Sequence, residues 1–156
     1  MLYGVQPNHS VLWESAADTT PPVADILDVT PDPRTTPVGE VTIQFSEPVT
    51  GFTVANLTLI QFGVGPLDLS ALPLTTTDQR TFTINLSSLT TQASRYSLLL
   101  SGNLANIQDL AGRSLTSPAS DSFSIITLYE LWIANFYPGV TDQNTIGMAA
   151  DPNNDG

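Results

Sequence analysis

The chain has no cysteine, no lysine and only one histidine among its 156 residues. Without cysteine it can form neither disulfides, nor thiol nucleophiles, nor cysteine-ligated zinc and iron–sulfur sites. A hydrolytic triad would have to use His9, which lies in an irregular polar stretch. A single histidine is also too few for a metal site built from histidines. We therefore predict that the chain is not an enzyme.

Basic residues are also scarce, because four arginines face fifteen Asp and Glu residues and the formal net charge is −11. Nucleic acid and anionic membrane surfaces both bind through cationic patches, so we expect neither as a partner. The acidity instead fits a protein kept soluble by repulsion, or one that meets divalent cations. Outside a cell the natural candidate is calcium.

Long apolar runs are absent as well, since none approaches the roughly 20 residues that a membrane-spanning helix needs. A signal peptide starts with positive charge, whereas the first basic residue here is Arg34. We therefore do not expect Met1 to begin a signal peptide, and expect any export signal to lie outside this chain.

The central part of the sequence alternates apolar and polar residues with period two, most clearly over 40–46, 80–86, 95–101 and 121–126. Turn residues separate these segments from further strands expected at 24–29, 57–62 and 67–71. About seven strands of this kind predict an all-β antiparallel sandwich. We expect nine apolar residues to form its core: Val41, Ile43, Phe45, Phe82, Ile84, Tyr96, Leu98, Phe123 and Ile125.

Three regions are predicted: an N-terminal linker at 1–22, the sandwich at 23–127, and a short helix with an irregular tail at 128–156. Thr127 and Glu130 have the spacing of a capping box, which predicts the start of the helix. Leu128, Leu131 and Trp132 share one helical face. Because so short a helix is marginal alone, we expect it to dock on the sandwich or on a neighbouring domain.

Several strings together resemble the bacterial Ig-like domains that occur in tandem in large secreted and surface proteins: 18–22 (DTTPP), 39–52 (GEVTIQFSEPVTGF), 80–86 (RTFTINL), 96–100 (YSLLL) and 107–112 (IQDLAG). The resemblance covers roughly residues 18 to 127 and implies an Ig-like sandwich. Arg113 stands where the similar loop usually has asparagine, so a turn or ligand that depends on that asparagine is not carried over.

The resemblance implies a structural or adhesive spacer at the cell surface or in the extracellular space, beside other domains of the same polypeptide. Surface glycans or proteins are its possible further partners, and it implies no activity. Some similar surface domains carry lysine–asparagine crosslinks, which a chain without lysine cannot make.

The end of the chain is similar to the start of a dockerin-like or thrombospondin-type-3-like calcium loop. Asp151, Asn153, Asp155 and Gly156 match the first half of such a loop, in which oxygen ligands alternate and glycine permits a sharp turn. The later ligands are missing, so this metal site is incomplete. The alternative interpretation is a flexible Asx-rich linker.

Two other groups of acids are candidates for chemistry. Asp18, Glu47 and Asp109 could approach one pole of the sandwich and hold an interdomain calcium ion, or could be ordinary loop acids. Asp25 and Asp28 could form a glycosidase pair, but acids in or beside a strand are more often solvated surface.

An alternative function is a carbohydrate-binding accessory module of a secreted polysaccharide-degrading enzyme. It would require an exposed aromatic platform, for which the candidates are Trp13, Tyr129, Trp132 and Tyr137. All four lie outside the predicted sandwich, where an aromatic residue on a helix can equally serve as a docking residue.

Overall fold

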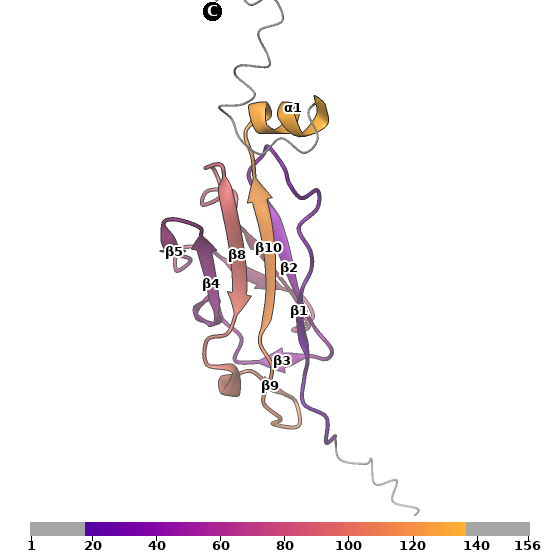
Figure 1. Cartoon of the computed structure of the whole chain (residues 1–156). Coiled ribbons are helices and arrows are strands. Elements are labelled where there is room, and N and C mark those ends of the chain that lie inside the picture. Colours follow the sequence, from indigo (N-terminus) through magenta and orange to yellow (C-terminus); the bar gives the residue numbers. More distant parts are fainter. Residues whose placement is uncertain (1–17, 137–156) are drawn as a thin grey trace, which may run out of the picture.

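The structure is a computed structural model that describes residues 18–136. Two four-stranded antiparallel sheets form a sandwich (Figure 1). The first sheet has the order β1 (Ala24–Ile26), β2 (Glu40–Phe45), β7 (Thr81–Asn85) and β6 (Leu74–Thr76). The second has the order β10 (Ala119–Ile125), β8 (Ser94–Leu100), β4 (Leu57–Gln61) and β5 (Gly65–Leu67). These orders correspond to the ABED and GFC sheets of the Ig fold, with β5 as an added edge strand, so the predicted fold class is confirmed.

A third, two-stranded sheet pairs β3 (Val49–Thr50) with β9 (Gln108–Asp109) at one end of the sandwich. Two short 3₁₀ helices, η1 (Val54–Asn56) and η2 (Leu104–Asn106), lie in the connections, and α1 (Leu128–Phe136) follows the last strand. Neither part of the small sheet is among the strands expected from the sequence. Two-residue strands carry too little alternation to be recognised from the sequence.

The core follows from the period-two pattern. In β2, Val41 and Ile43 lie opposite Ile84 and Phe82 of β7, and all four side chains are buried. All nine residues predicted for the core are buried in one cluster, so that prediction is confirmed.

Aromatic rings pack against one another on each of the two sheets of this core. Phe45, Phe52 and Phe82 meet edge to face, with ring centroids 4.9 to 5.7 Å apart. Tyr96 of β8 stacks on Phe123 of β10 at 5.6 Å. Such pairs add to the free energy gained by burying the rings.

Two expected strands have different bounds. The first ends at Ile26, and the chain then crosses to the other sheet, where Arg34 pairs in parallel with Ile125. The segment 67–71 is not a strand: β5 ends at Leu67, and Asp68 accepts a hydrogen bond from the Ser70 amide in a tight turn before β6. An aspartate that bonds the backbone two residues on favours this turn over a strand.

Helix α1 begins at the predicted capping box, where Thr127 and Glu130 exchange backbone–side-chain hydrogen bonds of 2.7 and 3.1 Å. Ile133 is its buried residue. Leu128 and Trp132, expected on the docking face, are exposed. In the described residues no helix is long and apolar enough to cross a membrane.

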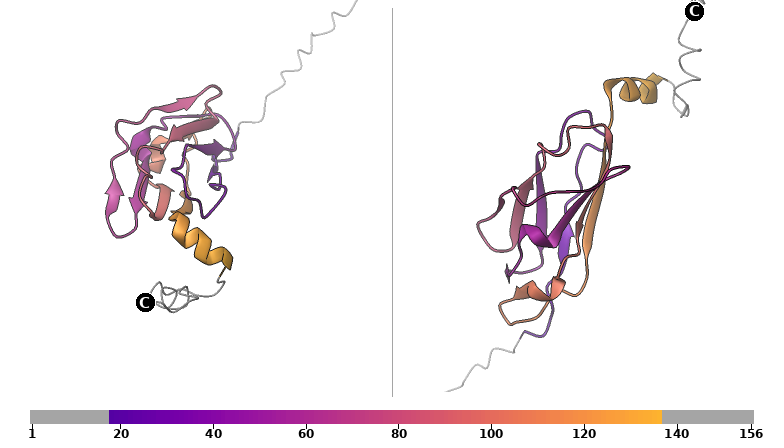
Figure 2. Two further views of the ribbon diagram at one scale, coloured as in Figure 1. Left: turned by 90° about the horizontal axis from the view of Figure 1, so that it is seen from above. Right: turned by 90° about the vertical axis from the view of Figure 1, so that its left-hand side faces the viewer.

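The described chain enters and leaves the sandwich at opposite ends (Figures 1 and 2). Residues 18–22, here called the entry strap, run past the end that carries β3 and β9. Helix α1 leaves β10 at the far end. Candidate residues near the strap are therefore well separated from those on α1.

Candidate metal centre

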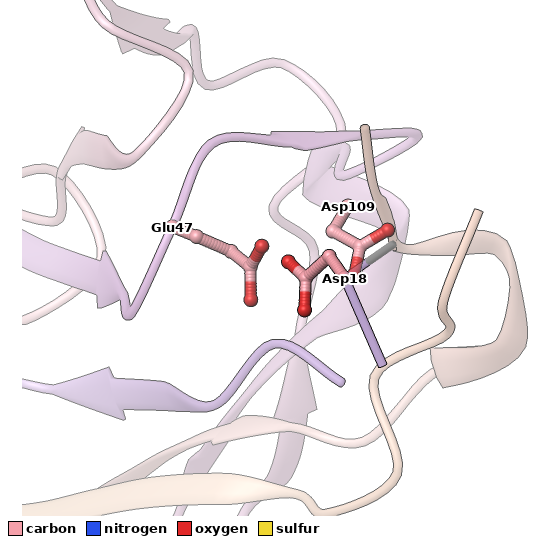
Figure 3. A group of neighbouring side chains, drawn as sticks. All are labelled: Asp18, Glu47 and Asp109. Atoms are coloured by element: carbon pink, nitrogen blue, oxygen red, sulfur yellow. The ribbon is translucent and has the colours of Figure 1, made fainter. Parts of the chain in front are cut away.

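Three carboxylates converge beside the entry strap. One oxygen from each of Asp18, Glu47 and Asp109 lies within 4.8 Å of the other two. Figure 3 shows the carboxylates of Glu47 and Asp18 facing each other, with that of Asp109 beside Asp18. The structure thus brings together the three acids that the sequence offered as a possible calcium site.

The small sheet positions two of these acids. Glu47 lies in the loop that leads from β2 into β3, and the β3–β9 ladder places Val49 directly opposite Asp109. Gly51, with φ +78°, then turns the chain so closely past η2 that an added Cβ would clash with the Asn106 carbonyl oxygen. Only glycine fits this approach, which holds β3 in place.

The third acid is held by the entry strap. Asp18 accepts a hydrogen bond from the Thr20 amide at 2.9 Å, and its backbone carbonyl accepts one from Nε of Arg113 at 3.3 Å. Further on, Val23 and Ser46 are joined by two hydrogen bonds of 2.8 and 2.9 Å. The strap and Val23, the residue that follows it, therefore contact the two segments that carry the other acids.

Asp109 is the buried member of the group, with 3% of its surface exposed. Its Oδ1 accepts hydrogen bonds from the backbone amides of Ala111 and Arg113, at 2.7 and 2.8 Å. Its Oδ2 is buried and has no hydrogen-bond partner within residues 18–136. A buried carboxylate oxygen without a partner is unfavourable, because it has lost water and gained nothing in return.

The loop after Asp109 also explains why arginine is compatible with position 113. The turn is closed by the backbone of that residue, whose amide bonds Asp109 Oδ1 and whose carbonyl accepts from the Asp109 amide at 3.0 Å. Gly112, with φ +79°, supplies the left-handed residue. The turn therefore needs no asparagine side chain at residue 113.

The electrostatics of the group disfavour three negative charges. Desolvation raises the pKa of Glu47, and the nearby carboxylates of Asp18 and Asp109 raise it further. Arg113 donates to the backbone of Asp18 and not to its carboxylate. Three carboxylates at this spacing can bind a hard cation, which takes oxygen ligands.

The other candidates are placed as follows. Asp25 and Asp28 are both exposed. Tyr129 and Trp132 stack on one another on α1, with ring centroids 6.2 Å apart. The remaining candidates lie outside the described residues: His9, Trp13, Tyr137, Asp151, Asn153 and Asp155.

Solved structures with a similar arrangement include three of the bacterial S-layer protein SbsC. Its N-terminal part has a TM-score of 0.43 and 17% sequence identity, covering 65% of this chain and 23% of that chain. The chain of residues 31–844 has a TM-score of 0.39 and 16% sequence identity, and domains 1–6 have a TM-score of 0.38 and 16% sequence identity. Each of these two matches covers 65% of this chain and 14% of the other chain. The present chain thus spans less than a quarter of these proteins.

No curated protein sequence matches the chain. The family model described as "Bacterial Ig-like domain" matches residues 18–125, which include both sheets and the three carboxylates. Because this match spans more than half of the sequence, the chain belongs to the bacterial Ig-like domain family.

Proposed function

We propose that this chain is a non-enzymatic structural module, a spacer within a larger secreted or cell-surface bacterial protein. Its partners in this role are the neighbouring domains of the same polypeptide. An adhesive role would add contacts with surface glycans or proteins. The family match supports a module of the kind that occurs beside other domains.

The observation that carries the proposal is the position of the two chain exits. The entry strap and α1 lie at opposite ends of the long axis of the sandwich (Figure 2). Domains joined to both exits would therefore be held apart by the full length of the module. A domain with both exits at one end would fold its neighbours back beside each other.

Force applied through the two exits would act on the contact between the segment 29–34 and β10. The Arg34 amide donates to the Ser124 carbonyl at 3.0 Å, and the Ile126 amide donates to the Arg34 carbonyl at 2.8 Å. Asp32 accepts a further bond from the Ser124 amide, also at 2.8 Å. Since the pairing is parallel, a pull along the long axis loads these bonds together and not one after another.

Single-molecule stretching tests this role directly. Thr19 and Leu128 are exposed and flank the sandwich, and the native chain has no cysteine, so Thr19→Cys and Leu128→Cys give two unique attachment points. We expect all-or-none unfolding under load. Asp32→Ala should lower the unfolding force, because it removes a bond that bears the load.

Asp68→Ala is the matched control. Asp68 also accepts a backbone amide bond, at 2.9 Å, but within its own turn and away from β10. The unfolding force of this variant should equal that of the parent chain. Gradual extension at low force, or equal forces for Asp32→Ala and the parent, would contradict the spacer role.

A second candidate function, carbohydrate binding, is favoured by the aromatic residues of α1. Tyr129 stacks on Trp132 with ring centroids 6.2 Å apart, and Phe136 lies tilted against Trp132 at 5.6 Å. Their exposed fractions are 46%, 39% and 67%. Flat exposed rings in series can stack against the faces of sugar rings.

A glycan array distinguishes this candidate from the spacer role. Binding that is lost in Trp132→Ala but kept in Phe62→Ala would support it, because Phe62 is a 77% exposed aromatic residue in the connection between β4 and β5 and not on α1. Absence of glycan binding by the parent chain, or equal binding by both variants, would leave the stack as a surface for docking a neighbouring domain.

A further inference from the structure

The strongest unexplained feature of the molecule is the buried oxygen Oδ2 of Asp109. Its partner oxygen Oδ1 is saturated by two backbone amides, whereas Oδ2 has no hydrogen-bond partner in the described part of the chain. Native structures rarely leave such a group unpaired, and an ion is one of the ordinary explanations. The oxygen also belongs to a carboxylate that lies beside two others.

The neighbours of the Asp109 carboxylate indicate the kind of ligand. Carboxylate oxygens of Asp18 and Glu47 lie within 4.8 Å of an oxygen of Asp109, and like charges at that spacing repel. A cation placed among them would convert this repulsion into attraction. It would also supply a partner for the buried carboxylate of Asp109.

The chemistry of the ligands favours calcium. All three side chains offer oxygen only, and the described cluster contains no histidine. Calcium accepts six to eight oxygen ligands in flexible geometry, including water and backbone carbonyls. Magnesium demands a near-ideal octahedron and loses its water reluctantly, while zinc prefers nitrogen and sulfur ligands. Asp18 is exposed, which leaves room for water on the ion.

We propose that Asp18, Glu47 and Asp109 form a calcium site that fastens the entry strap to the end of the sandwich. The ion would join the strap, the β2–β3 loop and β9. The direction in which a preceding domain leaves this end would then depend on calcium. The inference stands on the cluster and on the unpartnered oxygen of Asp109, and it does not require the spacer role.

Calorimetric titration of the whole chain with calcium chloride tests the site. We expect one ion per chain with a dissociation constant between about 10⁻⁴ and 10⁻³ M, the range of extracellular modules. Glu47→Gln and Asp18→Asn should each weaken binding by at least tenfold, because each removes a charged ligand. Both positions are at least partly exposed, so these variants are expected to fold.

Two control variants separate this site from other acids. Asp151→Asn, in the calcium-loop-like tail, should leave the affinity unchanged, because half a loop supplies too few ligands to bind at that strength. Asp68→Asn removes a carboxylate from a turn outside the cluster and should also have no effect.

A thermal measurement adds a readout that a purely structural role would not give. In chelator, Glu47→Gln should melt at or above the temperature of the parent chain, since it relieves repulsion. In 10 mM calcium the order should reverse, because an ion that binds only the folded state raises the melting temperature of the parent. A calcium-dependent loss of protease cleavage within residues 18–22 would show that the strap is fastened.

Three results would overturn the proposal. The first is absence of calcium binding by the parent chain up to 10 mM. The second is unchanged affinity in both Glu47→Gln and Asp18→Asn. The third is loss of binding in Asp151→Asn, which would move the ion to the tail. A failed spacer test would not alter these outcomes, because calorimetry measures binding and not mechanical load.

Discussion

The backbone amide of Val29 donates a 3.0 Å hydrogen bond to Oδ2 of Asp121, a residue of β10 that lies 92 positions later in the chain. This bond ties the segment that follows β1 to the last strand. We expect Asp121→Ala to lower the free energy of unfolding by about 1–3 kcal/mol, since it leaves a partly buried amide without a partner. Equilibrium unfolding in urea measures the change.

Asp25 provides the control for this prediction, because it is an exposed aspartate on β1. Asp25→Ala should change the free energy of unfolding by less than about 0.5 kcal/mol. If the two variants were equally stable, Asp121 would contribute nothing to the contact between the first and last strands.

A second prediction concerns the aromatic core. Phe82 meets Phe45 and Phe52 edge to face at 5.7 and 4.9 Å and is 6% exposed. Phe82→Ala should cost about 3–5 kcal/mol, because it removes buried surface and leaves a cavity. A loss of that size is a large part of the stability of an ordinary domain.

Calorimetric melting checks this, with Phe62→Ala as the control. Phe62 is 77% exposed, so its truncation should shift the melting temperature little. A near-neutral shift for Phe82→Ala would contradict the assignment of Phe82 to the core.

The fold could be predicted from the sequence because burial follows a local pattern. Residues such as Ile43 and Leu98 alternate with polar neighbours, and a period of two assigns each to one face. The capping box at Thr127 is equally local, and the structure contains it. Features that depend on contacts between distant segments left no such pattern, among them the β3–β9 ladder and the crossing from β1 to β10.

The candidate site was predictable only as a set of acids. Asp18, Glu47 and Asp109 all lie outside the strands expected from the sequence, in segments that could approach one end of the sandwich. No sequence pattern predicted the different surroundings of the two Asp109 carboxylate oxygens. Oδ1 accepts hydrogen bonds from two backbone amides, whereas Oδ2 has no partner in the described residues. That distinction depends on the geometry of the loop at 109–113.

The third prediction concerns the hydroxyl group of Tyr96. It donates a 2.9 Å hydrogen bond to the carbonyl of Gln92, four residues upstream, in the manner of the tyrosine corner of Ig folds. Tyr96→Phe keeps the buried ring but removes the donor. We expect a loss of about 1 kcal/mol in the free energy of unfolding, measured by urea denaturation.

Tyr129→Phe is the control, because Tyr129 is 46% exposed on α1. Because this side chain is largely exposed, its truncation should leave the free energy of unfolding nearly unchanged. A larger loss for Tyr129→Phe than for Tyr96→Phe would show that the corner bond does not stabilise the domain.

The last prediction concerns Asp78, in the turn between β6 and β7. Its Oδ1 accepts backbone amide bonds from Thr81 at 2.7 Å and from Arg80 at 2.9 Å. These bonds, that of Thr81 first, lower the pKa of Asp78 from 3.8 to about 2. The charged form of Asp78 is therefore favoured in the folded state. Its stabilising effect is complete above the pKa of Asp78 in the unfolded chain, near 4, and is lost as the pH falls through the folded-state pKa of about 2.

We therefore expect the stability difference between the parent chain and Asp78→Asn to be constant above about pH 5 and to shrink between about pH 4 and 2. The amide keeps an acceptor in the turn but does not titrate, so the difference isolates Asp78 from the other acids. Urea unfolding at several pH values measures it, and a carboxyl titration by nuclear magnetic resonance should give a midpoint for Asp78 of about 2. A midpoint near 4, or a difference independent of pH, would show that the two amide bonds do not hold the charged form.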